Sequence, residues 1–207
     1  MDGTVLDTLD DLTDAVNAAM RQFGLPEVSR STVRANLGNG AEYLIRHVMP
    51  DDSPETLRKE VYDWYRPYYD AHCGIKTAPY EGILTLMEKL RSQRVKLAIV
   101  SNKPDKAVQA LAEEFFKGLL ETAVGESASV RRKPSPDTVL AAAELIGVGR
   151  GECVYVGDSE VDVMTAENAG MDCIAVEWGF RSRRQLEEAG APVIVDTAEK
   201  LYEALTV

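Results

Sequence analysis

The sequence predicts an α/β protein: a parallel sheet covered by helices on both faces, interrupted near its start by an all-helical insertion. From residue 79 onward, short apolar strands alternate with helices, which is the pattern of a parallel sheet covered on both sides. Residues 9–77 show helical periodicity only. Polar residues follow several strand ends, where open parallel sheets bind their ligands.

The insertion at 9–77 is predicted to consist of four helices, at 9–23, 31–37, 41–49 and 54–72. Gly24 and Pro26 supply the end of the first helix, and Ser31 is a candidate N-cap of the second. Pro67 is a candidate kink in the fourth helix, which also carries a row of aromatic residues. Their helical spacing favours packing within the insertion over a ligand site.

The rest of the chain alternates between strands and helices. The predicted strands cover 97–100, 122–125, 153–156, 173–176 and 193–195. The predicted helices cover 82–93, 104–116, 136–146, 161–169 and 182–189. We therefore expect two domains, an α/β core formed by 1–8 with 78–207 and a helical cap formed by 9–77.

Composition narrows the possible partners. The 207 residues, 45% of them hydrophobic, suit one globular body or a core with a modest insertion. A formal net charge of −11 disfavours nucleic acid and anionic membranes as partners, whereas a small phosphorylated metabolite remains compatible, because a bound cation can invert the local field. The sequence shows no apolar run of roughly 18 residues and no leader, so we expect a cytoplasmic protein. It does not distinguish a monomer from a homodimer.

Three polar motifs follow the ends of strands, two of them predicted within the sequence and one expected before it. Asp2-Gly3-Thr4 would follow a strand before the sequence. Ser101-Asn102-Lys103 and Gly157-Asp158-Ser159 follow the strands at 97–100 and 153–156. Because the carboxyl ends of parallel strands meet at one edge of a sheet, we expect these motifs to lie close together.

Two further residues belong to the same edge. Asp162 comes four residues after Asp158, and Lys133 lies in the loop before the helix at 136–146. The set then offers hard oxygen ligands for Mg²⁺, and donors and positive charge for phosphate oxygens. The sequence therefore predicts a phosphoryl-transfer site.

Each motif taken alone has a simpler interpretation. Asp-Gly-Thr commonly forms a turn, and Ser-Asn after a strand commonly caps a helix. Lys133 beside two arginines is typical of a solvated basic loop. The agreement of order, spacing and strand context favours the catalytic interpretation over these. A solvated helix face is expected for Arg181, Arg183 and Arg184.

With these motifs, the sequence resembles the haloacid-dehalogenase-like (HAD) hydrolase superfamily, in the branch of phosphoglycolate phosphatases with a helical cap. The resemblance covers essentially the whole chain, and it rests on Asp2-Gly3-Thr4-Val5-Leu6-Asp7-Thr8, Ser101-Asn102-Lys103, Lys133-Pro134-Ser135-Pro136 and Gly157-Asp158-Ser159-Glu160-Val161-Asp162. It implies a HAD-like Rossmannoid parallel sheet with an inserted cap that closes over the site and selects the leaving group.

The resemblance also implies an activity, the Mg²⁺-dependent hydrolysis of a small, phosphoglycolate-like phosphomonoester through an aspartyl-phosphate. The implied catalytic residues are Asp2, as general acid and base, Ser101 and Lys133. The implied substrate-binding residues are Thr4, Ser101, Asn102 and Lys133. The implied metal-binding residues are Asp2, through its backbone carbonyl, Asp158 and Asp162, the last as a ligand or through water.

The family's nucleophilic aspartate stands two positions before Asp2, immediately before Met1. We therefore expect the sequence to begin after its first strand and, as given, to bind Mg²⁺ weakly and not to turn over. The alternatives are a catalytically inactive HAD-fold binding or regulatory protein, or a related pyrophosphatase, nucleotide or sugar-phosphate phosphatase, or phosphosugar mutase. The residues in the cap decide among the enzymes, and the sequence does not show which of them face the substrate.

Overall fold

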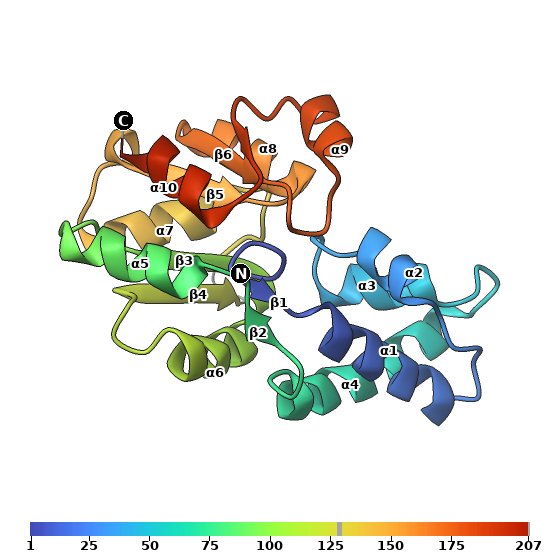
Figure 1. Ribbon diagram of the computed structural model, residues 1–207. Coiled ribbons are helices and arrows are strands. Elements are labelled where there is room, and N and C mark those ends of the chain that lie inside the picture. Colours follow the sequence, from blue (N-terminus) through green and yellow to red (C-terminus); the bar gives the residue numbers. More distant parts are fainter. Residues whose placement is uncertain (128–129, 207) are drawn as a thin grey trace. The chain divides into compact units, whose positions relative to one another are not determined.

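The computed structural model describes residues 1–127 and 130–206, and the chain divides into two compact units (Figure 1). The core unit comprises Met1–Asp7 and Pro79–Val207, and the helical unit comprises Thr8–Ala78. Two short strands, β1 (Leu6–Asp7) and β2 (Ala78–Pro79), pair where the chain leaves the core unit and returns to it. Within the described ranges, none of the helices combines the length and the apolar character needed to cross a membrane.

The helical unit contains α1 (Leu9–Gln22), α2 (Arg30–Ala35), α3 (Ala41–Val48) and α4 (Glu55–His72). Its main packing is between α1 and α4, which bury the apolar faces that the periodicity predicts. Pro67 lies inside α4, which continues to His72 as one helix. The N-cap of α2 is Ser29 and not Ser31: α2 begins at Arg30, so the Ser29 side chain can accept from the Thr32 backbone N–H.

A buried carboxylate ties the start of the helical unit to its end. Asp11, in the first turn of α1, accepts hydrogen bonds from the backbone N–H groups of Lys76 and Thr77 and from the Thr77 hydroxyl, at 2.8–3.0 Å. Asp11 and Thr77 are both buried. Hydrogen bonds from these three donors, of which the Lys76 N–H is shared between both oxygens, compensate the cost of burying this carboxylate.

The core unit contains two groups of parallel strands. In the first, β3 (Ala98–Pro104) pairs with β4 (Thr122–Glu126); in the second, β6 (Asp172–Val176) lies between β5 (Val154–Gly157) and β7 (Ile194–Val195). The helices around them are α5 (Ile83–Ser92), α6 (Asp105–Phe115), α7 (Asp137–Ile146), α8 (Glu160–Ala169), α9 (Arg183–Glu188) and α10 (Ala198–Leu205). The predicted α/β class with a parallel sheet is confirmed.

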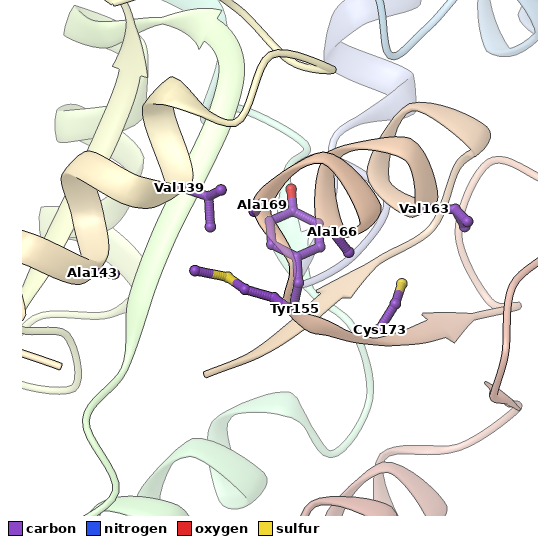
Figure 2. Close-up of a cluster of buried hydrophobic side chains, with 8 residues drawn as sticks. Val139, Ala143, Tyr155, Val163, Ala166, Ala169 and Cys173 are labelled. Atoms are coloured by element: carbon purple, nitrogen blue, oxygen red, sulfur yellow. The ribbon is translucent and has the colours of Figure 1, made fainter. Parts of the chain in front are cut away.

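Part of the core is built from α7, α8, β5 and β6 (Figure 2). Its buried side chains are Val139, Ala143, Tyr155, Val163, Ala166, Ala169, Met171 and Cys173. The three alanines keep the helix surfaces that pack in this cluster small, which leaves room for the Tyr155 ring. This packing anchors β5, and with it the polar residues at the carboxyl end of that strand.

Candidate active site

The predicted site residues gather at the carboxyl ends of β3 and β5. The Lys103 ammonium, at the end of β3, donates to both carboxylate oxygens of Asp2, at 2.8 and 3.1 Å. The Thr4 hydroxyl donates to Asp158, directly after β5, at 2.9 Å. The first four residues therefore lie between the two strand ends, as the sequence predicts for residues at one edge of a sheet.

Lys133, Asp162 and Tyr155 form a buried ion pair with a third partner. The Lys133 ammonium donates to Asp162 Oδ1 at 2.7 Å and to the Tyr155 hydroxyl at 3.1 Å, while that hydroxyl donates to the same Oδ1 at 2.9 Å. The exposed fractions of the Lys133 and Asp162 side chains are only 9% and 7%. Lys133 therefore does not lie in a solvated basic loop, and its charge is held inside the core unit.

The charges of this pair are fixed across the neutral pH range. Burial favours the neutral form of each group, but the Asp162 carboxylate raises the pKa of Lys133 above its ordinary value. Burial likewise acts to raise the pKa of Asp162, yet Lys133 and Ser159 hold that pKa well below its usual range. Tyr155 stays protonated, because burial and then Asp162 raise the pKa of its hydroxyl.

Asp158 is less well compensated than Asp162. Its two oxygens accept from the Thr4 hydroxyl and from the Phe180 backbone N–H, both at 2.9 Å. Burial and the nearby Asp162 carboxylate raise the pKa of Asp158 to about 6. This carboxylate is therefore the site's strongest candidate to hold a cation.

Two glycines let the backbone approach Asp158 closely. Gly3 has a φ of +75°, and a Cβ on it would lie 2.2 Å from Asp158 Oδ2. A Cβ on Gly179 would lie 2.3 Å from the Gly3 carbonyl oxygen and 2.4 Å from the Asp158 Cβ. Side chains at these positions would displace the carboxylate, so glycine is needed both at position 3 and at position 179.

Asn102 joins two loops that are distant in the sequence. Its amide accepts from the Lys133 backbone N–H at 2.7 Å and donates to the Lys133 carbonyl at 2.9 Å. Ser101 and Asn102 are both buried, and the Ser101 hydroxyl accepts from the Lys103 backbone N–H at 3.2 Å. The structure thus brings Ser101, Asn102 and Lys133 together, as the sequence predicts.

Three residues of the site have no role assigned from the sequence, although Lys103 belongs to one of the motifs expected there. Lys103 pairs with Asp2, Tyr155 bridges Lys133 and Asp162, and Arg181 is buried. The prediction that Arg181 lies on a solvated helix face is wrong. Its guanidinium makes a two-point contact with Glu160, at 2.7 and 2.9 Å, and this pair ties the loop at 177–181 to α8.

The lone pairs that remain show where a hard cation would fit. Asp162 accepts four hydrogen bonds, from Lys133, Tyr155, Ser159 and the Asp158 backbone N–H, which fill its acceptor positions. Each Asp158 oxygen accepts only one hydrogen bond from the described residues. In the part of the chain that the structure describes, no three Asp, Glu, His or Cys side chains are grouped to hold a metal ion. A cation on Asp158 would complete its shell with backbone, water or substrate oxygens.

Comparison with known proteins places this arrangement in a family. The family model described as haloacid dehalogenase-like hydrolase matches residues 1–176. A phosphoglycolate phosphatase from Xanthomonas campestris pv. campestris (strain 8004) is 30% identical, over 87% of this chain and 82% of that protein. One from Pseudomonas syringae pv. tomato is 29% identical, over 97% of this chain and 76% of that protein.

A solved structure agrees over nearly the whole length. The crystal structure of a presumed phosphoglycolate phosphatase from Lactobacillus delbrueckii subsp. bulgaricus is 44% identical, with a TM-score of 0.95, over 99% of this chain and 95% of that chain. The family model covers most of the present chain, including every residue of the site except those at 177–181. This chain belongs to the haloacid dehalogenase-like hydrolases.

Proposed function

We propose that this protein is a Mg²⁺-dependent phosphatase that hydrolyses a small organic phosphomonoester through an aspartyl-phosphate. The observation that carries the proposal is the buried set of Asp158, Asp162 and Lys133, which lies at the same sheet edge as Asp2 and Ser101. Burying charged groups costs free energy even when they are paired, so their presence here favours a functional role. The set combines the carboxylates that can hold a metal ion with the cation that can offset phosphate charge, as phosphoryl transfer requires.

The nucleophile would be an aspartate two positions before Asp2. The backbone nitrogen of Met1 is buried and lies within electrostatic range of Lys133, Asp2, Asp158 and Asp162. A residue placed directly before Met1 would therefore lie next to this cluster. Its carboxylate would need only to face the same centre to reach a bound phosphoryl group.

Two steps complete the reaction. The nucleophile's carboxylate oxygen forms a bond to phosphorus while the ester P–O bond breaks, and Asp2 gives its proton to the departing alkoxide oxygen. Water then attacks the same phosphorus and gives a proton to Asp2, while the acyl P–O bond breaks. The products are the alcohol and inorganic phosphate, and both carboxyl groups return to their starting forms.

The remaining residues bind and orient the phosphoryl group. Ser101 and the Asn102 backbone N–H would donate to phosphoryl oxygens, and Lys133 would offset the charge between nucleophile and phosphate. The two hydrogen bonds between the Asn102 side chain and the Lys133 backbone hold the loops that carry these groups close together. In the structure the Thr4 hydroxyl is directed to Asp158, so we assign Thr4 to orienting that carboxylate.

The donor set fits Mg²⁺. Asp158 is a buried carboxylate with acceptor capacity left, and the Asp2 backbone carbonyl is the second oxygen that we assign to the ion. Asp162, whose acceptor positions are filled, would act beside the ion by holding Lys133. When bound, Mg²⁺ would supply positive charge that neutralises the phosphate oxygens.

The substrate class comes from the relatives. Two relatives that match this chain over most of their own length are named phosphoglycolate phosphatases. We therefore propose a substrate similar to phosphoglycolate, a short alkyl phosphate that carries a carboxylate. The helical unit would act as the cap that selects the leaving group.

The test uses the natural full-length chain, including any residues encoded before Met1. It is assayed for phosphate release from phosphoglycolate, a sugar phosphate, a nucleoside monophosphate and pyrophosphate, with Mg²⁺ and with EDTA. We expect Mg²⁺-dependent turnover that is highest with phosphoglycolate. A folded full-length protein with no Mg²⁺-dependent turnover on any of the four would refute the proposal.

A further inference from the structure

We propose that Lys103 is a positioning residue, which holds the Asp2 carboxyl group where it can pass its proton to the leaving oxygen. This inference rests on the proposed function, in which Asp2 is the general acid. It adds a second lysine with a role separate from that of Lys133.

The contact between the two residues is specific. The Lys103 ammonium reaches both oxygens of one carboxylate, at 2.8 and 3.1 Å, which restricts rotation of the carboxyl group about its last torsion. The Lys103 side chain is 3% exposed, whereas the Asp2 side chain is 22% exposed. The lysine is therefore enclosed by protein, and the carboxylate keeps an open side on which a substrate can bind.

Stability alone is a poor explanation for this pair. Lysine is rarely fully buried, and removing its ammonium from water costs as much as a buried ion pair returns, or more. An apolar side chain of similar volume would fill the same space at lower cost. A buried lysine beside a partly exposed catalytic carboxylate is better explained by a role in positioning that carboxylate for proton transfer.

The two lysines of the site are held by different carboxylates. Lys133 is held by Asp162 and Tyr155, and its backbone is tied to Asn102. Lys103 lies at the end of β3 and contacts Asp2. Loss of Lys133 would therefore remove the positive charge that offsets the phosphate. Loss of Lys103 would instead displace Asp2, the acid that protonates the leaving oxygen.

This division predicts a dependence on the leaving group. An alkoxide is strongly basic and needs a proton as the P–O bond breaks, so it depends on a correctly placed acid. Nitrophenolate is weakly basic and leaves without a proton. A defect confined to Asp2 should therefore slow an alkyl phosphate much more than p-nitrophenyl phosphate, whereas general damage to the site slows both alike.

The experiment compares K103M with wild type in the full-length protein with Mg²⁺, and measures kcat for phosphoglycolate and p-nitrophenyl phosphate. We expect kcat for phosphoglycolate to fall about 10²-fold, the lower end of the contribution of general acid catalysis, and the fall for p-nitrophenyl phosphate to be at least about tenfold smaller. K106M is the matched control, because Lys106 is exposed and three residues away; both of its rates should equal those of wild type. Circular dichroism and thermal melting establish that each variant is folded.

Equal losses with both substrates, or no loss with either, would overturn the inference. Loss of the folded state in K103M and also in K103Q would assign Lys103 a structural role and would overturn it as well. A wild-type protein that hydrolyses neither substrate would instead contradict the proposed function, so the two failures are distinguishable.

Discussion

Replacing Asp158 with asparagine should stabilise the metal-free protein at neutral pH. Asp158 is buried beside Asp162, and its pKa is raised from 3.8 to about 6. At about 1.4 kcal/mol per pH unit, this difference corresponds to about 3 kcal/mol of stability that the wild type lacks once the carboxyl group is ionised. Asparagine keeps both local contacts: its oxygen can accept from the Phe180 N–H, and its NH₂ can donate to the Thr4 hydroxyl.

The pH dependence follows from the direction of the shift. Because the folded pKa is higher than the unfolded one, the protonated Asp158 favours folding, and this contribution is complete below pH 4. It is lost as the pH rises through about 6. The amide of the D158N variant does not titrate, so the stability difference between the two proteins should be smallest below pH 4 and largest above pH 6.

Urea unfolding in EDTA between pH 4 and pH 8 measures this difference. D172N is the control, because Asp172 is an exposed aspartate on β6, and its replacement should change the free energy of unfolding by less than about 0.5 kcal/mol. Saturating Mg²⁺ should then stabilise the wild type but not D158N. A D158N protein that is no more stable than wild type at pH 7.5, or a difference that does not vary with pH, would refute the reasoning.

Three other perturbations test the surroundings of the site. G179A should lower the free energy of unfolding by at least about 1–3 kcal/mol, because the added Cβ would lie 2.3 Å from the Gly3 carbonyl oxygen. G151A is the control and should melt like wild type, because no atom beyond its chain neighbours lies within 4 Å of the added Cβ. K133M should cost about 3–5 kcal/mol by leaving Asp162 buried without its cation, and adding D162N should restore part of that loss in urea titrations; no restoration would argue against the ion pair. D11A should lower stability by about 3 kcal/mol and speed amide hydrogen exchange in the loop before β2, and unchanged exchange would contradict the role assigned to this carboxylate.

The sequence predicts the sheet well because its strands are short, continuous and apolar. Runs such as 97–100 and 153–156 are recognisable without any tertiary information, and each ends in polar residues that the sheet then brings together. The last helix, α10, is not among the predicted helices, although Thr197 is a suitable N-cap residue in the sequence. In the structure Thr197 caps α10 by accepting from the Lys200 backbone N–H, and Leu201 is buried. The two-residue strands β1 and β2 are too short to produce a periodic pattern.

The unpredicted parts of the site depend on contacts between distant residues. Lys103 meets Asp2 across 101 positions, and Arg181 meets Glu160 across 21 positions. The motif at 101–103 does not show which carboxylate Lys103 contacts, and a charged residue such as Arg181 is expected to be exposed, which is the common outcome for such residues. Tyr155 lies in a strand that is apolar along its length, so periodicity cannot indicate that its hydroxyl reaches a polar centre.

The carboxylate of Asp11 has a consequence for how this chain can be altered. By binding the backbone at residues 76 and 77, it keeps the entrance and the exit of the helical unit next to each other. An inserted segment whose ends are adjacent can be exchanged without distorting the core unit, since a short connection already spans the distance between its ends. Exchanging residues 9–77 for the corresponding segment of a relative should therefore be a practical way to graft a new substrate preference onto an unchanged core unit.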